Sequence, residues 1–201
     1  MKKNEFPARF IVFEGLDGAG KSTQAKLLHD YFRDERGMKA HYTSEPTPSL
    51  IGGIIQSQIR KDWKSSNECL QLLFSADRLY HIEKEIIPLL EKGIHVICDR
   101  YFLSTAAYGD DMEWLLELNK KALFPDIVFL LNISPKESMR RIYSNRTGGV
   151  HLFEKEETLS RVQGNYKILA ERFSDFVVSI EAERSIEEIA KDIQKIAEQR
   201  L

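Results

Sequence analysis

A glycine-rich segment that ends in lysine and serine carries the strongest chemical signal in this chain. The apolar run at residues 10–14 leads into Gly15-Leu-Asp-Gly-Ala-Gly20-Lys21-Ser22, and a helical pattern follows. An apolar strand, the spacing Gly-x-x-x-x-Gly-Lys-Ser and a following helix are together typical of a phosphate-binding loop. The backbone N–H groups of such a loop converge on polyphosphate oxygens at the positive end of the helix. The segment therefore predicts a nucleoside triphosphate site.

The side chains of this loop have separate expected roles. Lys21 can reach the outer phosphates, and the Ser22 hydroxyl can ligate Mg²⁺. Gly15 and Gly20 allow backbone angles and a close approach that a side chain would block. The residues of this segment that we expect to hold the donor nucleotide are Gly15, Leu16, Asp17, Gly18, Ala19, Gly20, Lys21, Ser22 and Thr23.

An acidic and a basic residue follow a second apolar run. Ile94–Cys98 leads directly into Asp99 and Arg100. In an open parallel sheet, ligands bind at the carboxyl ends of the strands, so this pair would face the same edge as the phosphate-binding loop. Asp99 could then hold Mg²⁺, directly or through water, and Arg100 could grip a second phosphate group with two N–H donors. The alternative for the pair taken alone is a surface salt bridge.

A third segment places an aromatic ring beside a guanidinium group. Phe74 and Arg78 are four residues apart in a helical pattern, so they share one face of the helix. This arrangement suits stacking on a nucleobase and hydrogen bonding to its edge. Taken alone, a Phe at this spacing is more often a core residue, and the Arg is more often a solvated charge.

The composition limits the class of protein. The chain has 201 residues, 42% of them hydrophobic, which suits a single domain over residues 1–201 with a sizeable core. Its net charge of −2 gives no reason to expect binding to a nucleic acid polymer. The sequence starts without an apolar leader and contains no stretch that predicts a membrane span. Cys69 and Cys98 form no metal-binding spacing, so we expect a reduced, cytoplasmic environment with Cys98 in the core.

Apolar runs alternate with helical patterns along the chain. The runs that we expect to form strands are Arg9–Glu14, Met38–Thr43, Ile94–Asp99, Asp126–Asn132 and Phe176–Ile180. Their nearly continuous Ile, Val, Leu and Phe content predicts burial on both faces and hence a parallel sheet. The segments between them are long enough for helical crossovers. The predicted fold class is α/β, with a three-layer α/β/α architecture around a five-stranded parallel sheet.

Local signals mark the ends of several helices. Ser134-Pro135-Lys136-Glu137 and Ser185-Ile186-Glu187-Glu188 match the capping box Ser-x-x-Glu, and Gly37 is a suitable stop for the first helix. The region from about 141 to 156 differs, because Asn145-Arg146-Thr147-Gly148-Gly149 interrupts the helical pattern with turn formers and one cation. We expect a short lid over the ligand edge there, with an ordinary surface loop as the alternative.

Three segments, in this order, resemble the motifs of the thymidylate kinase family. They are the phosphate-binding loop at Glu14–Thr23, a base-binding helix with Phe74-x-x-x-Arg78-x-x-His81, and the segment Asp99-Arg100-Tyr101-x-x-Ser104-x-x-Ala107-Tyr108. The segment Arg184–Ile189 is also similar to the family's adenine-side loop and last helix. The resemblance therefore extends over essentially the whole chain. The loop alone specifies only a superfamily, whereas the other two motifs make the assignment specific.

The resemblance implies the nucleoside monophosphate kinase fold and the reaction of ATP with dTMP to give ADP and dTDP, with Mg²⁺ as the metal. The implied catalytic residues are Lys21, Asp99, Arg100 and Arg146, and Ser22 and Asp99 are the implied metal ligands. Family members are commonly homodimers, and we carry this over as an expectation.

The resemblance also assigns the acceptor nucleotide to particular residues. Phe74 would stack on thymine, Arg78 would contact the base at its O4 edge, and Arg100 would hold the acceptor phosphate. Thr105 occupies the position that reads the N3 side of the base, and Tyr108 would lie against the 2′ carbon of the deoxyribose. A further acceptor contact, to the sugar or to the surroundings of phosphate and Mg²⁺, is expected from Asp17.

Family members differ in where they place the cation that approaches the transferred phosphoryl group. Some carry it inside the phosphate-binding loop, but this chain has Gly18 there, so the lid must supply it. Arg146 is the leading candidate, with Arg140 and Arg141 close by. Either of those two could instead pack on adenine, and we include Arg141 among the residues expected to bind ATP.

Two positions depart from the family pattern. Gly109 stands where the family often has Gln, and Ser44-Glu45-Pro46-Thr47-Pro48 stands where it often has Arg-Glu-Pro-Gly-Gly. Both departures are expected near the acceptor site. They leave open the preference between dTMP and dUMP but leave the reaction class unaffected.

Other functions fit parts of this pattern less well. A regulatory GTPase would need Asn-Lys-x-Asp for guanine, and Asn119-Lys120-Lys121-Ala122 lacks the acid. A deoxynucleoside kinase, or a kinase for another deoxynucleoside monophosphate, is the closer alternative. A deoxynucleoside kinase would need a base that deprotonates a 5′-hydroxyl. Glu14 is the obvious candidate for that base, although it equally suits a structural role. The intact Gly-Lys-Ser, Asp99 and Arg100 argue against a protein that only binds nucleotides.

Overall fold

The computed structural model describes residues 2–144 and 156–200. The strands are β1 (Phe10–Gly15), β2 (Ala40–Ser44), β3 (His95–Asp99), β4 (Ile127–Asn132) and β5 (Val177–Glu181). The helices are α1 (Lys21–Asp30), α2 (Leu50–Ile59), α3 (Asn67–His81), α4 (Ile87–Glu91), α5 (Phe102–Tyr108), α6 (Met112–Leu118), α7 (Pro135–Ser144), α8 (Glu156–Arg172) and α9 (Ile186–Arg200). Short π-helical turns, η1 (Tyr31–Glu35) and η2 (Ile82–Ile86), continue α1 and α3.

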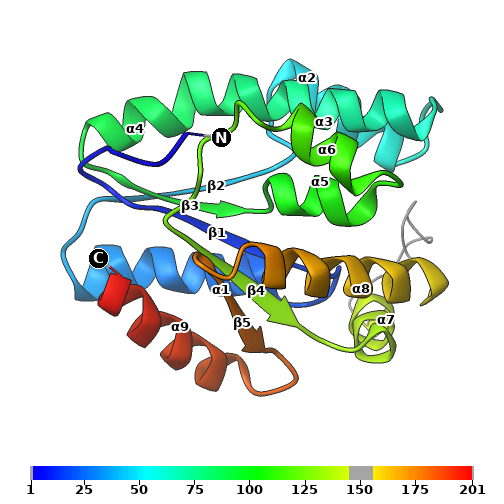
Figure 1. Ribbon diagram of the computed structural model, residues 1–201. Coiled ribbons are helices and arrows are strands. Elements are labelled where there is room, and N and C mark those ends of the chain that lie inside the picture. The colour runs from blue at the N-terminus through cyan, green and yellow to red at the C-terminus, as the bar shows by residue number, and fades with distance from the viewer. Residues whose placement is uncertain (1, 145–155, 201) are drawn as a thin grey trace.

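The strands form one parallel sheet in the order β2-β3-β1-β4-β5. All five predicted strands are confirmed, and each predicted boundary lies within two residues of the observed one. The helices form a layer on each face (Figure 1): α1 and α9 lie below the sheet, and α3, α4 and α5 lie above it. The predicted three-layer α/β/α architecture is therefore confirmed.

Burial explains why these segments are strands. All six residues of β1 are buried, and so are the first five of β4. Parallel strands with helices on both sheet faces have no solvent-facing side, so every position can be apolar. Phe13 on β1 and Phe129 on β4 are both fully buried, and their ring centroids lie 5.3 Å apart. Cys98 on β3 is also fully buried, as predicted, whereas Cys69 is exposed.

The predicted helix ends are only partly confirmed. Gly37 adopts φ of 63°, and Met38 N–H donates to the Phe32 carbonyl at 2.8 Å, which closes the end of the first helical segment as predicted. At α9, the Ser185 and Glu188 side chains each bond to the other residue's backbone N–H, so this capping box forms completely.

The capping box predicted before α7 forms only by half. The Ser134 hydroxyl accepts from Glu137 N–H at 3.2 Å, as expected. The Glu137 carboxylate, however, accepts hydrogen bonds from Arg140 and Arg141 instead of reaching back to Ser134. Ser134 N–H donates to Glu183 at 2.7 Å. Two neighbouring cations outcompete a backbone N–H for this carboxylate because hydrogen bonds between charged groups are stronger.

The register of the sheet sets the position of the candidate site. Phe13 pairs with Asp99, so β1 and β3 end at the same edge, and the chain leaves β1 at Gly15 to form the phosphate-binding loop. The predicted lid region lies mostly outside the described residues: only 141–144, at the end of α7, and Glu156, at the start of α8, are described. No helix within residues 2–144 and 156–200 is long and apolar enough to cross a membrane.

The central position of Phe129 leads to a stability prediction. Phe129→Ala should lower the free energy of unfolding by about 3–5 kcal/mol, because it removes a fully buried ring and leaves a cavity. Denaturant unfolding followed by circular dichroism measures the change. Ile168→Ala on α8 is the matched control, since Ile168 is 54% exposed and its loss should change the value by less than about 0.5 kcal/mol. Equal effects of the two substitutions would contradict this description of the core.

Candidate active site

The phosphate-binding loop adopts a backbone that only glycine tolerates at several points. Gly15, Gly18 and Gly20 have φ of 139°, 75° and 94°. A Cβ atom on Gly15 would lie 2.5 Å from the Leu131 carbonyl oxygen of β4, so this glycine also allows the loop to pass close to the sheet. Gly20 is the residue before α1, whose first N–H groups therefore face the loop. This is the geometry that binds phosphate oxygens.

Lys21 is the charged group at the centre of the loop. Its side chain is buried, and Nζ donates to the Leu16 carbonyl oxygen at 2.7 Å. Burial, helped by the positive charge of Arg100, lowers the pKa of Lys21 to about 8. An ammonium group held in place by one carbonyl oxygen, in surroundings that disfavour its charge, is well prepared to bind an anion.

Ser22 and Asp99 meet where the loop faces the end of β3. The Ser22 hydroxyl donates to Asp99 Oδ2. Asp99 Oδ1 is buried and has no hydrogen-bond partner among the described residues. A buried carboxylate oxygen left unpaired is costly, and a carboxylate beside a hydroxyl is a donor set that suits Mg²⁺. The two residues therefore fit the metal that the sequence predicts for them.

Arg100 follows Asp99 at the end of β3. Its φ of 70° is rare for a residue with a side chain, and its backbone N–H donates to the Phe13 carbonyl oxygen at 2.9 Å. The guanidinium bonds to Asp17 and, at 3.0 Å, to the Ser104 hydroxyl. Such backbone geometry costs on the order of 1–3 kcal/mol and is concentrated at functional sites.

A cavity of about 280 Å³ brings these groups together. It is lined by Asp17, Gly18, Gly20, Lys21, Ser22, Thr23, Asp99 and Arg100. All of these residues were predicted from the sequence to bind nucleotide, phosphate or metal. The cavity combines the cations Lys21 and Arg100 with the carboxylates Asp17 and Asp99, as a site for phosphate and a metal ion requires.

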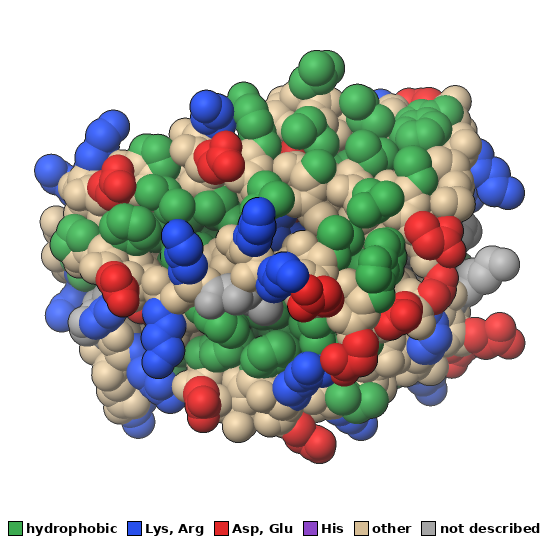
Figure 2. All heavy atoms as spheres, turned by 45° about the horizontal axis from the view of Figure 1, so that its top comes forward, with side chains coloured by type: hydrophobic (Ala, Val, Ile, Leu, Met, Phe, Trp, Pro, Cys, Tyr) green, Lys and Arg blue, Asp and Glu red, His purple; other side chains and the backbone are tan. Residues whose placement is uncertain are grey.

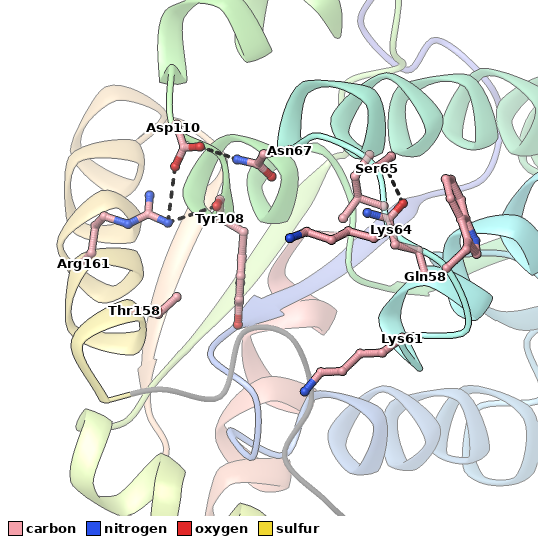
Figure 3. Close-up of a pocket in the computed structure, with 11 residues that line it drawn as sticks. Gln58, Lys61, Lys64, Ser65, Asn67, Tyr108, Asp110, Thr158 and Arg161 are labelled. Carbon is pink, nitrogen blue, oxygen red and sulfur yellow. Dashed lines mark hydrogen bonds and ion pairs between the residues drawn. The ribbon is translucent and has the colours of Figure 1, made fainter.

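A second cavity, of about 640 Å³, lies between the segment after α2, the start of α3, the end of α5 and the start of α8 (Figure 3). Of the residues predicted for the acceptor base and sugar, Tyr108 lines it, whereas Phe74, Arg78 and Thr105 do not. Its described lining residues are Gln58, Lys61, Trp63, Lys64, Ser65, Asn67, Leu70, Tyr108, Asp110, Thr158 and Arg161. The Arg100 guanidinium lies 5.4 Å from the centre of the Tyr108 ring. Because Arg100 lines the smaller cavity and Tyr108 the larger one, this contact places the two cavities next to each other.

Side chains of α8 hold the end of α5 and thereby place Tyr108. Arg161 donates to the Tyr108 and Gly109 carbonyl oxygens at 3.2 and 2.8 Å, and Asn165 donates to the Ala107 carbonyl oxygen at 2.8 Å. These bonds satisfy carbonyl groups that a helix end leaves unpaired. No local pattern points to either α8 residue, because their partners lie more than fifty positions away.

Glu14 is a structural residue in this arrangement. Its carboxylate accepts from Tyr101 N–H at 2.9 Å, from both the N–H and the hydroxyl of Ser104, and from the Tyr166 hydroxyl at 3.0 Å. Burial raises the pKa of Glu14, and the hydrogen bonds from Ser104 oppose that shift. A carboxylate that accepts four hydrogen bonds at the start of α5 is engaged in holding that helix, which weakens its candidacy as a base for a 5′-hydroxyl.

The predicted base-binding residues lie on and beside α3. Phe74 is half-buried, and Thr105 on the adjacent α5 is buried. Arg78 is 1% exposed, and its guanidinium bonds to Glu45 and Asn119. Arg78 is therefore not a solvated charge, and the protein itself fixes the position of its guanidinium group. Sequence reasoning missed both partners, which come from distant loops.

The surroundings of Gly18 and the bonds of the arginines on α7 help to decide which residue could supply the predicted catalytic cation. A Cβ atom on Gly18 would lie 3.0 Å from the Ser138 carbonyl oxygen and 3.3 Å from Arg141 Cβ, so α7 leaves little room for a side chain there. Arg140 bonds only to Glu137 among the described residues, whereas Arg141 bonds to Glu137 and to the Ala182 carbonyl oxygen at 2.8 Å. Arg146 lies outside the described residues.

Both departures from the family pattern have structural partners. A Cβ atom on Gly109 would lie 2.0 Å from the Leu115 side chain, so α6 packs where a longer side chain would begin. Thr47 donates through its N–H and its hydroxyl to the buried Asp77 at 2.8 and 2.6 Å. Each departure is therefore accommodated by a neighbouring helix.

The lowered pKa of Lys21 predicts a change of stability with pH in the nucleotide-free protein. Lys21→Met should raise the free energy of unfolding at pH 7, on the order of 1–3 kcal/mol, because it removes a buried charge. Between pH 8 and about 10.5 the unfolded chain binds more protons at this lysine than the folded one, so the wild type gains stability with rising pH. The advantage of Lys21→Met should therefore disappear over this range. Denaturant unfolding at pH 7 and pH 10 tests this, and an advantage that is equal at both values would contradict it.

Comparison with known proteins agrees with this geometry. A family model described as thymidylate kinase matches residues 13–193. A probable thymidylate kinase of Thermococcus kodakarensis is 44% identical over 202 residues, which cover 94% of this chain and 97% of that protein. The thymidylate kinase of Plasmodium falciparum is 38% identical over 200 residues, which cover 97% and 92%. The chain belongs to the thymidylate kinase family of nucleoside monophosphate kinases.

Proposed function

We propose that this enzyme transfers the γ-phosphoryl group of ATP to dTMP with Mg²⁺ bound at Ser22 and Asp99. The observation that carries the proposal is the contact between Arg100 and Tyr108, because it places the cavity of the phosphate-binding loop next to a cavity large enough for a nucleotide. Donor and acceptor phosphates would meet at Arg100. The deoxynucleoside kinase alternative is not favoured, since the family match and the engaged Glu14 both argue against it.

The reaction needs positioning and charge neutralisation more than covalent chemistry. The acceptor phosphate is already ionised, so no general base is required. Lys21 would leave the Leu16 carbonyl oxygen and bind the outer phosphates of ATP, and Arg100 would hold the acceptor phosphate. Mg²⁺, when bound, neutralises charge on the donor phosphates. The described His residues need no chemical role in this mechanism.

The acceptor nucleotide would lie along α3 and α5. Phe74 would stack on thymine, and Arg78 and Thr105 would contact the edge of the base. Tyr108 would exclude a ribose 2′-hydroxyl by the bulk of its ring, and Asp17 would lie near the acceptor sugar or phosphate. The burial of Thr105 and Tyr108 supports this, because buried groups on a helix are held firmly enough to select a substrate by shape.

The donor nucleotide would be held by the loop and by residues next to it. The bond between Arg141 and the Ala182 carbonyl oxygen supports packing of Arg141 on adenine, since it brings α7 beside the predicted adenine-side segment. The limited space at Gly18 supports a catalytic cation from the region of about 141–156, with Arg146 as the leading candidate. Arg140 remains the alternative to Arg146.

We also propose that the enzyme is a cytoplasmic homodimer. Large hydrophobic side chains are exposed on α2 and α3: Leu50 by 85%, Ile54 by 40%, Leu72 by 48% and Tyr80 by 44%. Figure 2, which turns the upper side of Figure 1 toward the reader, shows hydrophobic side chains gathered on this face. Apolar surface concentrated in this way is typical of a contact between proteins. Sedimentation analysis measures the state directly.

Turnover of four acceptors tests the proposed function. With ATP and Mg²⁺, an assay of ADP release should show selective turnover of dTMP over dUMP, dCMP and thymidine. Lys21→Ala should lower kcat by about 10²–10³, the scale for losing one preorganised charged donor. Turnover of thymidine but not of dTMP would assign the chain to the deoxynucleoside kinases instead. Near-normal turnover by Lys21→Ala would contradict the role of Lys21.

Phe74 leads to a prediction that separates the two nucleotide sites. Phe74→Ala should raise KM for dTMP by about 5- to 150-fold, because a stacked base contributes roughly 1–3 kcal/mol. KM for ATP should stay the same. Trp114→Ala on α6, which removes a partly exposed aromatic ring outside both sites, should change neither value. An effect of Phe74→Ala on ATP alone would place α3 at the donor site.

A further inference from the structure

Arg78 is the most completely restrained charged side chain of α3. Its Nε and Nη2 donate to Glu45 Oε2 at 2.9 and 2.6 Å, and its Nη1 donates to Asn119 Oδ1 at 2.6 Å. The guanidinium carbon Cζ lies over the Tyr101 ring, 5.1 Å from its centre. A planar group held on two edges and one face can neither rotate nor shift without breaking a contact. The three partners come from the segment after β2, the end of α6 and the segment after β3.

The two polar partners are themselves held in place. Asn119 is buried, and its Nδ2 donates to the Leu115 carbonyl oxygen at 2.8 Å and to the Ser75 hydroxyl at 3.3 Å, so its Oδ1 must face Arg78. The second Glu45 oxygen lies 3.2 Å from His81 Nδ1. His81 Nε2 in turn lies 2.9 Å from the Thr43 hydroxyl. Every group that restrains Arg78 therefore has a fixed orientation of its own.

His81 also balances the charge of this cluster. Although burial lowers it, the hydrogen bonds to Glu45 and Glu85 raise the pKa of His81 to about 9. Two cations, Arg78 and His81, thus face two carboxylates, Glu45 and Glu85. Buried charges persist only when they are paired and hydrogen-bonded in this way.

Arg78 keeps hydrogen-bond donors that its protein partners do not use. A guanidinium group has five N–H donors and no acceptor. The three hydrogen bonds above use three of them, which leaves one N–H on Nη1 and one on Nη2 for a ligand. The fixed group therefore offers donors alone and cannot present an acceptor.

We propose that Glu45 and Asn119 are positioning residues that hold Arg78 rigid and thereby separate pyrimidines with an oxygen at C4 from those with an amino group there. The inference rests on the proposed function, in which Arg78 faces the C4 edge of the acceptor base. Thymine and uracil carry an acceptor oxygen at C4, whereas cytosine carries an NH₂ donor. A mobile Arg side chain could turn away from that NH₂ group, but a rigid one leaves two sets of donors facing each other in a buried site.

The physical reason for strong discrimination is the cost of unpaired donors. A site built to hydrogen-bond one polar group rejects a ligand that lacks it far more strongly than an apolar pocket rejects a missing methyl group. That cost exists only while the site cannot rearrange. Glu45 and Asn119 therefore contribute to specificity by keeping Arg78 rigid, since the charge of Arg78 alone would not give this discrimination.

Kinetics with dTMP and dCMP test the proposal. Asn119→Ala frees one edge of Arg78, and Glu45→Gln weakens the hold on the other while keeping its shape. In each variant, kcat/KM for dTMP should fall at least about tenfold, the scale for losing a hydrogen bond to a charged group, whereas kcat/KM for dCMP should stay within about threefold or rise. The ratio of the two should thus fall at least about threefold, with KM for ATP unchanged. Gln163→Ala, which loses a 2.9 Å bond from α8 to the Ile133 carbonyl oxygen, is the matched control and should keep the wild-type ratio.

The outcomes distinguish this inference from the proposed function. If the wild type phosphorylates dTMP but both variants lose activity on dTMP and dCMP equally, Glu45 and Asn119 are merely structural and the inference is wrong. If the wild type does not phosphorylate dTMP, the proposed function fails and the inference fails with it. Thermal unfolding of each variant identifies one that does not fold, and the ratio measured for the other variant then decides.

Discussion

Parallel pairing of β1 with β3 is the constraint on which this enzyme depends. Because Phe13 pairs with Asp99, the chain leaves β1 as the phosphate-binding loop directly beside the carboxyl end of β3. The Ser22 hydroxyl can then reach Asp99, and Arg100 can donate its backbone N–H to Phe13. A shift of one residue in this register would turn Asp99 to the opposite face of the sheet. The apolar core that fixes the register therefore also fixes the site.

Two clusters of buried charge lie in this molecule, one around the phosphate-binding loop and one around Arg78. The difference in their hydrogen bonding indicates what each can bind. Around the phosphate-binding loop the pairing is incomplete. Within the described part of the chain, Lys21 donates its one hydrogen bond to a carbonyl oxygen, and Asp99 Oδ1 has no hydrogen-bond partner. Around Arg78 each guanidinium nitrogen donates one hydrogen bond to Glu45 or Asn119, and one N–H on each of Nη1 and Nη2 is left over. Unpaired groups are tolerated where a ligand completes them, whereas three bonds to one side chain fix its geometry. The first cluster thus suits phosphate and metal, and the second suits recognition of a base.

The sequence was informative where a local pattern determines the outcome. The five strands followed from continuous apolar runs, and the cavity around Lys21 followed from glycine spacing that only a tight loop requires. The capping box at Ser134 forms only by half, because the Glu137 carboxylate bonds to Arg140 and Arg141 instead of the Ser134 N–H, and the motif takes no account of such neighbours. Asn119 could not be predicted at all, because its contact with Arg78 joins residues 41 positions apart and depends on how α3 and α6 pack.

The departure from the family pattern at residues 44–48 is accommodated by the surrounding structure and leaves the predicted chemistry unchanged. Thr47 brings two hydrogen-bond donors into a buried loop, and Asp77 accepts from both. These bonds offset the free energy that burying the polar groups of Thr47 would otherwise cost. Gly52 allows this loop to lie against α2, since a Cβ atom there would be 1.9 Å from the Thr47 carbonyl oxygen. The same loop carries Glu45, one of the two polar residues that hold Arg78. A change at position 47 is therefore compatible with the family's chemistry only because Asp77 keeps the loop, and with it Glu45, in place.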